Sequence, residues 1–233
     1  MQKSHAVLLF ALVPAARYLW AMSQPPVLWS FRRCPYAMRA RLGLASAGLS
    51  VELREILLRD KPAAFRAASP SATVPCLDLG TRQIDESLDI MLYALAQHDP
   101  EALLDMPAEG HALIAECDGP FKQALDRTKY ATRYPESNME TERTRASAFI
   151  AKLDAQIGAE SWLFGPQPKL ADLAILPFVR QFAHIDQAWF AAQPWPAVQS
   201  WLSAFKAAPR FAAIMQKYPP WQPSGAGHPF PES

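Results

Sequence analysis

The sequence predicts an α/β domain in the first part of the chain and an all-helical domain in the second part. Short apolar or alternating segments, which are typical of β-strands, occur between residues 27 and 84. Beyond residue 107 the apolar residues recur with helical spacing. Two proline breaks, at Pro100 and Pro107, separate these patterns. The predicted division is an N-terminal extension (1–24), an α/β domain (25–98), a linker (99–106), a helical domain (107–218) and a proline-rich tail (219–233).

The composition argues against several classes of function. The 233 residues include 23 basic and 22 acidic side chains, so no excess of positive charge predicts a nucleic-acid partner. Three unevenly spaced cysteines (Cys34, Cys76 and Cys117) argue against a disulfide framework and favour a reducing compartment, which predicts a cytoplasmic protein. No histidine lies near a cysteine at zinc-ligand spacing, so we expect no metal site.

The first 24 residues allow two interpretations. Residues 6–13 form an apolar run of signal-peptide length that is too short to span a bilayer, so we expect no membrane partner. No small-x-small cleavage site follows before Arg17. The alternative, which we favour, is that translation begins at Met22 and leads directly into the first strand.

A β-α-β unit is predicted at the start of the α/β domain. Residues 27–31 are apolar and form a strand, and residues 35–47 follow with a helical pattern that ends at Gly48, a suitable helix C-cap. Residues 49–56 alternate between apolar and polar side chains, as a strand does. Two strands joined by a crossover helix are parallel and form a right-handed unit.

The rest of this domain is predicted to add a helix, a hairpin and a second long helix. A short helical segment follows Asp60-Lys61-Pro62, and residues 74–84 form two strands joined near Gly80. Residues 85–87 begin a helix whose apolar side chains recur at i, i+3, i+4 and i+7 from Leu88. The order β-α-β-α-β-β-α is that of the thioredoxin-like fold.

No strand pattern is visible beyond the linker. Helical patterns cover residues 109–133, 138–157, 170–184, 195–207 and 209–217. The segment 170–184 is apolar on most sides, so we expect it to be buried in the helical domain. The tail from Pro219 is rich in proline and glycine, which predicts a surface or mobile segment.

Cys34 stands at the predicted junction between the first strand and the first helix. Backbone N–H groups at a helix start are unpaired and carry partial positive charge, which can lower a thiol pKa. Arg32, Arg33 and Arg39 add positive charge nearby in the sequence, and Pro35 suits the first helical position. We therefore expect a reactive thiolate at Cys34.

The turn Cys34-Pro35-Tyr36 resembles the active-site turn of glutaredoxins and of cysteine-type glutathione transferases of the omega kind. The dithiol version has a second cysteine in a C-x-x-C frame, and that position is Ala37 here. The motif is thus similar to a monothiol site, whose partner thiol comes from outside. On the tripeptide alone, a buried cysteine that starts a helix is an equally good interpretation.

Three further motifs resemble the glutathione-binding pattern of the same family, in order and spacing. Lys61 is similar to the lysine that reaches the glycyl carboxylate of glutathione. Val74-Pro75 resembles the cis-proline turn whose backbone pairs with the cysteinyl part. Glu86-Ser87 resembles the acid-serine pair that holds the γ-glutamyl end, because a helix start offers N–H groups to a carboxylate and an acid can pair with an ammonium.

The helical domain carries a weaker resemblance. Leu170-Ala171-Asp172 looks like the start of the family's buried helix, but Lys169 stands where the family has Ser or Thr, so half of the capping box is missing. Spacing of i, i+4 places Lys122, Asp126 and Tyr130 on one helix face.

In the family such a helix lines the second-substrate cleft, which would make Tyr36 and Tyr130 pocket residues. A solvated charged face is the alternative interpretation of the helix. Cys76 and Cys117 are expected in the core.

The resemblance implies a glutathione-dependent thiol transferase or reductase in which Cys34 forms a mixed disulfide with glutathione. It also implies a homodimer, with glutathione as co-substrate and a small electrophile or disulfide as second substrate. Two alternatives stay open. One is a transferase of the same fold that conjugates or cleaves an electrophile, and the other is a non-enzymatic binding protein on that fold.

Overall fold

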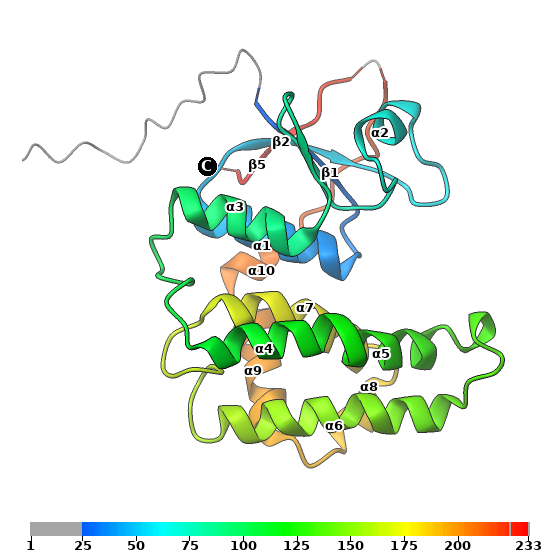
Figure 1. Cartoon of the computed structure of the whole chain (residues 1–233), viewed down its shortest axis with the longest axis vertical. Coiled ribbons are helices and arrows are strands. Elements are labelled where there is room, and N and C mark those ends of the chain that lie inside the picture. Colours follow the sequence, from blue (N-terminus) through cyan, green and yellow to red (C-terminus); the bar gives the residue numbers. More distant parts are fainter. Residues whose placement is uncertain (1–24, 224, 233) are drawn as a thin grey trace, which may run out of the picture.

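The computed structural model describes residues 25–223 and 225–232. Both interpretations of residues 1–24 therefore lie outside the described residues. The chain forms a mixed α/β sheet domain followed by a helical domain, as predicted, and Figure 1 shows the two stacked one above the other. The strands are β1 (Val27–Ser30), β2 (Val51–Glu55), β3 (Cys76–Asp78), β4 (Gln83–Ile84) and β5 (His228–Phe230).

The helices follow the predicted order closely. The α/β domain contains α1 (Pro35–Ala47), α2 (Ala63–Ala68) and α3 (Ser87–Gln97). The helical domain contains α4 (Ala108–Glu116), a π-helical turn (Cys117–Phe121), α5 (Lys122–Lys129), a 3₁₀ turn (Ala131–Arg133), α6 (Met139–Ile157), α7 (Leu170–Ala183), α8 (Gln187–Ala191), α9 (Pro196–Ala207) and α10 (Pro209–Ile214). The short helix α8 has no counterpart among the predictions.

The sheet has the strand order β4-β3-β1-β2-β5. β1 pairs in parallel with β2 and antiparallel with β3, which confirms the β-α-β unit and the hairpin. Side chains of β1 alternate between the two faces. Leu28 belongs to the large core that includes α1, and Trp29 packs on the other face against Phe65 of α2, with ring centroids 5.6 Å apart.

The tail is not a loose surface segment, and the expectation of no strand beyond the linker is wrong. Residues His228–Phe230 form β5, which pairs antiparallel with β2 and covers that edge of the sheet. Phe230 is buried, and Trp221 packs edge-on against Trp29 with centroids 5.1 Å apart. At Gly227 an added Cβ would lie 2.6 Å from the carbonyl oxygen of Leu53, so this close approach requires glycine.

Helix α1 joins the two domains. It packs beside α3 of the α/β domain and against α7 and α10 of the helical domain, as Figure 1 shows. Two buried arginines fix the second contact. Arg39 donates from Nε to Ala174 O of α7 at 3.0 Å and makes a bidentate ion pair with Asp118. Arg41 donates to Ile214 O of α10 at 2.9 Å and pairs with Glu55 of β2.

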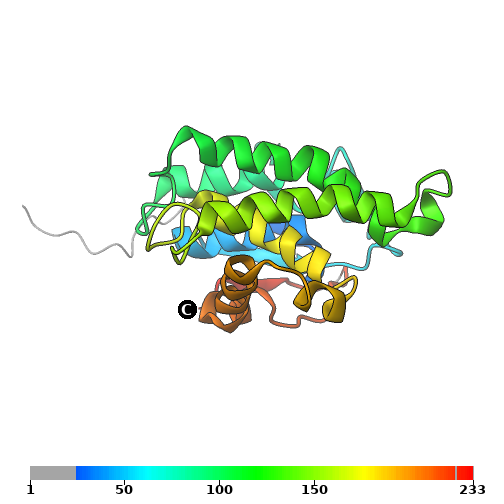
Figure 2. The same ribbon diagram turned by 90° about the horizontal axis from the view of Figure 1, so that it is seen from below.

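Helix α7 is the centre of the helical domain. Figure 2 shows it between the layer of α4, α5 and α6 and the helix α9, and nearly all of its residues are buried. At its start, Asp172 accepts hydrogen bonds from Leu163 N, Lys169 N and Trp201 Nε1 at 2.8–2.9 Å. Burial raises the pKa of this carboxyl to about 6 despite these bonds. The side chain of Lys169, the N-cap residue of α7, has no acceptor atom. The hydrogen bond from the helix backbone to the N-cap side chain is therefore missing, as predicted.

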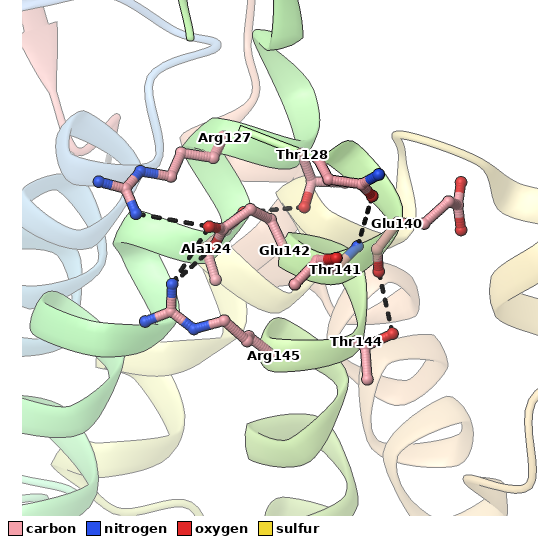
Figure 3. A network of polar contacts seen from close by, with 9 residues as sticks. Ala124, Arg127, Thr128, Glu140, Thr141, Glu142, Thr144 and Arg145 are labelled. Carbon is pink, nitrogen blue, oxygen red and sulfur yellow. Dashed lines mark hydrogen bonds and ion pairs between the residues drawn. The ribbon is translucent and has the colours of Figure 1, made fainter. Parts of the chain in front are cut away.

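A polar network ties the end of α5 to the start of α6. Figure 3 shows the buried carboxylate of Glu142 accepting hydrogen bonds from Arg127 of α5 at 3.4 Å and from Arg145 at 3.0–3.2 Å. Asn138 caps α6 by accepting from Thr141 N at 3.0 Å. These bonds fix the connection 130–138.

Candidate functional site

Cys34 lies at the N-terminal end of α1, where its backbone is extended and its side chain makes no capping bond. The turn is closed by Cys34 N, which donates to Phe31 O at 2.9 Å. The thiol is half-buried and donates to Val74 O, with Sγ and O 3.7 Å apart. The structure thus brings together two of the predicted motifs, the Cys-Pro-Tyr turn and the Val-Pro turn.

The expectation of a lowered thiol pKa at Cys34 is wrong for the structure described. Burial raises the pKa of Cys34, and this effect outweighs the backbone N–H groups of Ala37 and Tyr36 and the charges of Lys122 and Lys129, all of which lower it. Two of the three arginines counted in the sequence are engaged elsewhere, while Arg33 lines a cleft beside Cys34. Arg39 is neutralised by Asp118 (their closest atoms 2.6 Å apart), and Arg32 donates from Nη1 to Met215 O at 3.5 Å.

The peptide bond between Val74 and Pro75 is cis, as the resemblance implies. It lies directly before β3, opposite the thiol of Cys34. The segment before it is held by Lys61, whose Nζ donates to Ala72 O at 2.9 Å. The lysine therefore stands beside the Val-Pro turn, where it can reach a carboxylate bound along that turn.

Glu86 and Ser87 lie at the start of α3, Glu86 as the N-cap and Ser87 as the first helical residue. Ser87 is buried, and its hydroxyl accepts a hydrogen bond from Arg39 Nη1 at 3.5 Å. The preceding Asp85 accepts from Ser69 Oγ and Ser71 N, each at 3.1 Å. Burial raises the pKa of Asp85, but hydrogen bonds from Cys76 and these serines outweigh it and keep the pKa below its ordinary value.

A first cleft of about 680 Å³ collects the predicted glutathione residues. It is lined by Cys34, Tyr36, Leu58, Lys61, Thr73, Val74, Pro75, Asp85, Glu86, Ser87 and Arg133. Every predicted glutathione-binding residue is on this lining, together with the cysteine. Sequence reasoning missed Leu58 and Arg133, whose place in the cleft depends on packing between distant segments.

A second cleft of about 430 Å³ adjoins the first and shares Cys34, Tyr36 and Leu58 with it. It is lined by Phe31, Arg33, Cys34, Pro35, Tyr36, Leu58, Lys122, Asp126, Lys129, Tyr130 and Gln181. The helix face with Lys122, Asp126 and Tyr130 therefore borders a cleft. Tyr36 belongs to both clefts and packs edge-on against Phe178 of α7, with centroids 4.8 Å apart. Gln181 was not predicted, because nothing in the pattern of α7 distinguishes it.

The other two cysteines are core residues, as expected. Cys76 and Cys117 are fully buried, and burial raises the pKa of both thiols. In the described part of the chain, no three His, Cys, Asp or Glu side chains gather where they could hold a metal ion. Among the same residues, no helix is long and apolar enough to cross a membrane.

Comparison with known proteins places the chain in a family. Residues 28–102 match the model of the glutathione S-transferase N-terminal domain, and residues 122–222 match that of the C-terminal domain. The two matches together span most of the chain. The chain belongs to the glutathione S-transferase family.

Individual relatives are distant. Protein IN2-1 homolog B of rice (Oryza sativa subsp. indica) is 27% identical over 154 residues, which is 64% of this chain and 62% of that protein, so the match spans less than two thirds of its length. Maleylacetoacetate isomerase of Pseudomonas aeruginosa is 24% identical over 214 residues. The match spans 84% of this chain and 97% of that protein. A glutathione transferase family member from Pseudomonas fluorescens, solved with two glutathione molecules bound, superimposes with a TM-score of 0.68 at 21% identity, covering 84% of this chain and 95% of that one.

Proposed function

We propose that the chain is a cysteine-type, omega-like glutathione transferase that works as a glutathione-dependent thiol transferase. The observation that carries the proposal is the position of Cys34. Its thiol stands at a helix N-terminus, faces Val74 O of the cis-proline turn at 3.7 Å, and borders both clefts. A nucleophile between two clefts can receive glutathione from one and a second thiol or disulfide from the other.

Glutathione would lie along the first cleft. Its γ-glutamyl end would meet Glu86 and Ser87 at the start of α3, where N–H groups bind a carboxylate and the acid pairs with the ammonium. Its cysteinyl backbone would pair with Val74 as an added strand. Its glycyl carboxylate would reach Lys61. This placement leaves the glutathione sulfur next to Cys34.

The reaction is a pair of thiol–disulfide exchanges. The Cys34 thiolate attacks the glutathionyl sulfur of a mixed disulfide, the Cys34–glutathione disulfide forms, and the second thiol leaves as a thiolate that takes a proton from water. A second glutathione thiolate attacks the same sulfur and releases glutathione disulfide and Cys34. The raised pKa of Cys34 lowers its thiolate fraction at pH 7, but a thiolate of higher pKa is the stronger nucleophile.

The test is the intact mass of the wild type and of Cys34→Ser after incubation with glutathione disulfide. We expect one glutathione adduct on the wild type, removed by fresh glutathione and absent from the variant. An adduct that maps to Cys76 or Cys117, or no adduct at all, would overturn the mechanism. A homodimer in the cytoplasm belongs to the same proposal, and sedimentation of the full chain checks the dimer.

A second candidate is a transferase that conjugates or isomerises a small electrophile, in which glutathione supplies its own thiolate. The raised pKa of Cys34 favours this candidate, because a protonated thiol can donate a hydrogen bond to that thiolate. The relative named as an isomerase points the same way. Cys34→Ser separates the two candidates, since a serine hydroxyl keeps the donor. Conjugation would survive the substitution, and thiol transfer would not.

A further inference from the structure

The tail is bonded to β2 at both ends of that strand. β5 pairs antiparallel with the first part of β2, as Figure 1 shows, and Gly227 N donates to Glu52 Oε1 at 2.8 Å. At the far end of the strand, Trp221 N donates to the carbonyl oxygen of Glu55 at 2.7 Å. The side chain of Glu55 accepts from Arg32 N, in the cysteine turn, at 2.6 Å. The tail is therefore bonded to a residue that also holds the cysteine turn.

The side chain of Trp221 packs on the face of the sheet that carries α2. Its ring lies edge-on against Trp29, and Trp29 packs in turn against Phe65 of α2. The guanidinium of Arg54 lies over both indoles, 4.7 Å from the ring centroid of Trp221 and 5.0 Å from that of Trp29. Trp221 Nε1 donates to Gly225 O at 2.8 Å. These contacts hold the indole in one orientation.

The small core that Trp221 joins also supports the first cleft. Its buried members are Trp29, Ile56, Phe65, Val74 and Cys76. Trp221 and Cys34 are both partly buried and pack against this core. Because Val74 and Cys34 line the first cleft, the small core contacts both the cleft and the tail.

Helix α2 depends on the small core for its position. The helix has six residues, too few for a helix that is stable on its own, and Phe65 is its only buried residue. Lys61 lies just before the helix, lines the first cleft and donates to Ala72 O, in the segment that leads to Val74. Looser packing around Phe65 would therefore release Lys61 and the segment that it holds.

We propose that Trp221 is a positioning residue for glutathione. It completes the small core beside the first cleft and so holds Lys61 and Val74 at the spacing that the ligand requires. This inference rests on the proposed function, which assigns the first cleft to glutathione. A tail that only covered the edge of the sheet would stabilise the fold and leave the glutathione affinity of the folded protein unchanged.

Titration calorimetry with S-methylglutathione measures the affinity without any exchange at sulfur. We expect Trp221→Ala to weaken binding about three- to tenfold, because the ligand must then order the loosened side chains. Trp221→Phe keeps an aromatic ring against Trp29 and should stay within about twofold of the wild type. Gly227→Ala is the matched control. Its added Cβ would lie 2.6 Å from Leu53 O, so it should destabilise β5 and leave the affinity unchanged.

The outcomes separate the two proposals. If the wild type does not bind S-methylglutathione, the proposed function and the inference both fall. If the wild type binds it and Trp221→Ala, shown by urea unfolding to be folded, binds it as tightly, the inference falls and the proposed function stands. Equal weakening by Trp221→Ala and Gly227→Ala would show that affinity only follows stability, which would also overturn the role of Trp221.

Hydrogen exchange of the wild type tests the inference whether or not the variants fold. Coupling between two sites is reciprocal, so bound ligand should hold the tail more firmly by the same factor. Amide exchange in the peptide around Trp221 should slow about three- to tenfold on saturation with S-methylglutathione. Peptides of α8, which lines neither cleft, should not change. Slower exchange in α2 without any change in the tail would overturn the inference.

The kinetic effect of losing Trp221 should fall on KM. In thiol transfer, Trp221→Ala should raise KM for glutathione about three- to tenfold and change kcat by less than about twofold, because the indole lines neither cleft. A fall in kcat with KM unchanged would contradict a role in positioning the ligand.

Discussion

The two clefts that meet at Cys34 are built in different ways. The first is made largely of short backbone motifs from one domain: a helix start, a cis-proline turn and the start of α3. The second combines the turn before α1, the start of α1 and Leu58 with side chains of α5 and α7 and with Tyr130, so it draws on both domains. Local backbone motifs therefore form the first cleft, while the second depends on how the two domains pack. Under the proposed function, the first would bind glutathione and the second would set what reacts with it.

Arg39 contacts residues that shape both clefts. This buried cation pairs with Asp118 of the helical domain and donates to Ser87 of the first cleft. Its guanidinium also lies over the ring of Tyr36, which lines both clefts, 5.8 Å from the ring centroid. Breaking this pair should therefore disturb both regions, and it is the largest effect that we predict.

Asp118→Asn should lower the free energy of unfolding by about 2–3 kcal/mol, because it leaves a buried charge unpaired. This decrease in the free energy of unfolding is smaller than that expected for a fully buried ion pair, because 31% of the Asp118 side chain is exposed. Urea unfolding measures the change. Glu116→Gln is the control, because its pair with Lys152 is exposed and should be worth under about 0.5 kcal/mol. Equal effects of the two substitutions would contradict a special role for Arg39.

The clefts should also be separable by substitution. Ser87→Ala removes a buried hydroxyl at the proposed γ-glutamyl position and should weaken glutathione binding about 10- to 100-fold, the value of a hydrogen bond to a charged group. Tyr130→Leu, in the second cleft, should change that affinity by less than about twofold. Calorimetry with glutathione measures both. If Tyr130→Leu weakened glutathione binding as much as Ser87→Ala did, the division into two clefts would be wrong.

The same contrast explains what could be predicted from the sequence. Residues at a strand end, a helix start or an X-Pro turn have local signatures, and for this reason Cys34, Val74-Pro75 and Glu86-Ser87 could be placed together before the structure was known. Helical spacing also placed Lys122, Asp126 and Tyr130 on one face. Gln181 could not be found in this way, because its role comes from the packing of α7 against a distant segment.

The sequence predictions for the C-terminal tail and for the pKa of Cys34 are wrong for the same physical reason. Both depend on packing between segments far apart in the chain, which a local sequence pattern does not show. The strand β5 is three residues long and contains Pro229, and it exists because β2 offers it an edge. The helix start and the positive charges counted along the sequence both predict a lowered pKa for Cys34. Burial outweighs them, and the nearest arginine in α1 is neutralised by Asp118.

The raised pKa of Cys34 predicts the pH dependence of thiol transfer. The reactive form is the thiolate, so below the raised pKa the rate constant kcat/KM should rise about tenfold per pH unit, and it should still be rising at pH 8. A rate that levels off near pH 6 would show a lowered pKa instead. Glutathione-dependent reduction of a mixed disulfide, followed between pH 6 and 9, decides this.

The smallest expected effect concerns the contribution of the second cleft to the reactivity of Cys34. Lys129 is exposed and lowers the pKa of Cys34 through its charge, so Lys129→Met should raise this pKa and slow alkylation of Cys34 by iodoacetamide about twofold at pH 7.5. Added salt should shrink the difference, because it screens an exposed charge. Lys152→Met should leave alkylation unchanged. A slowing that persists in high salt would mean that Lys129 acts by shaping the cleft rather than by its charge.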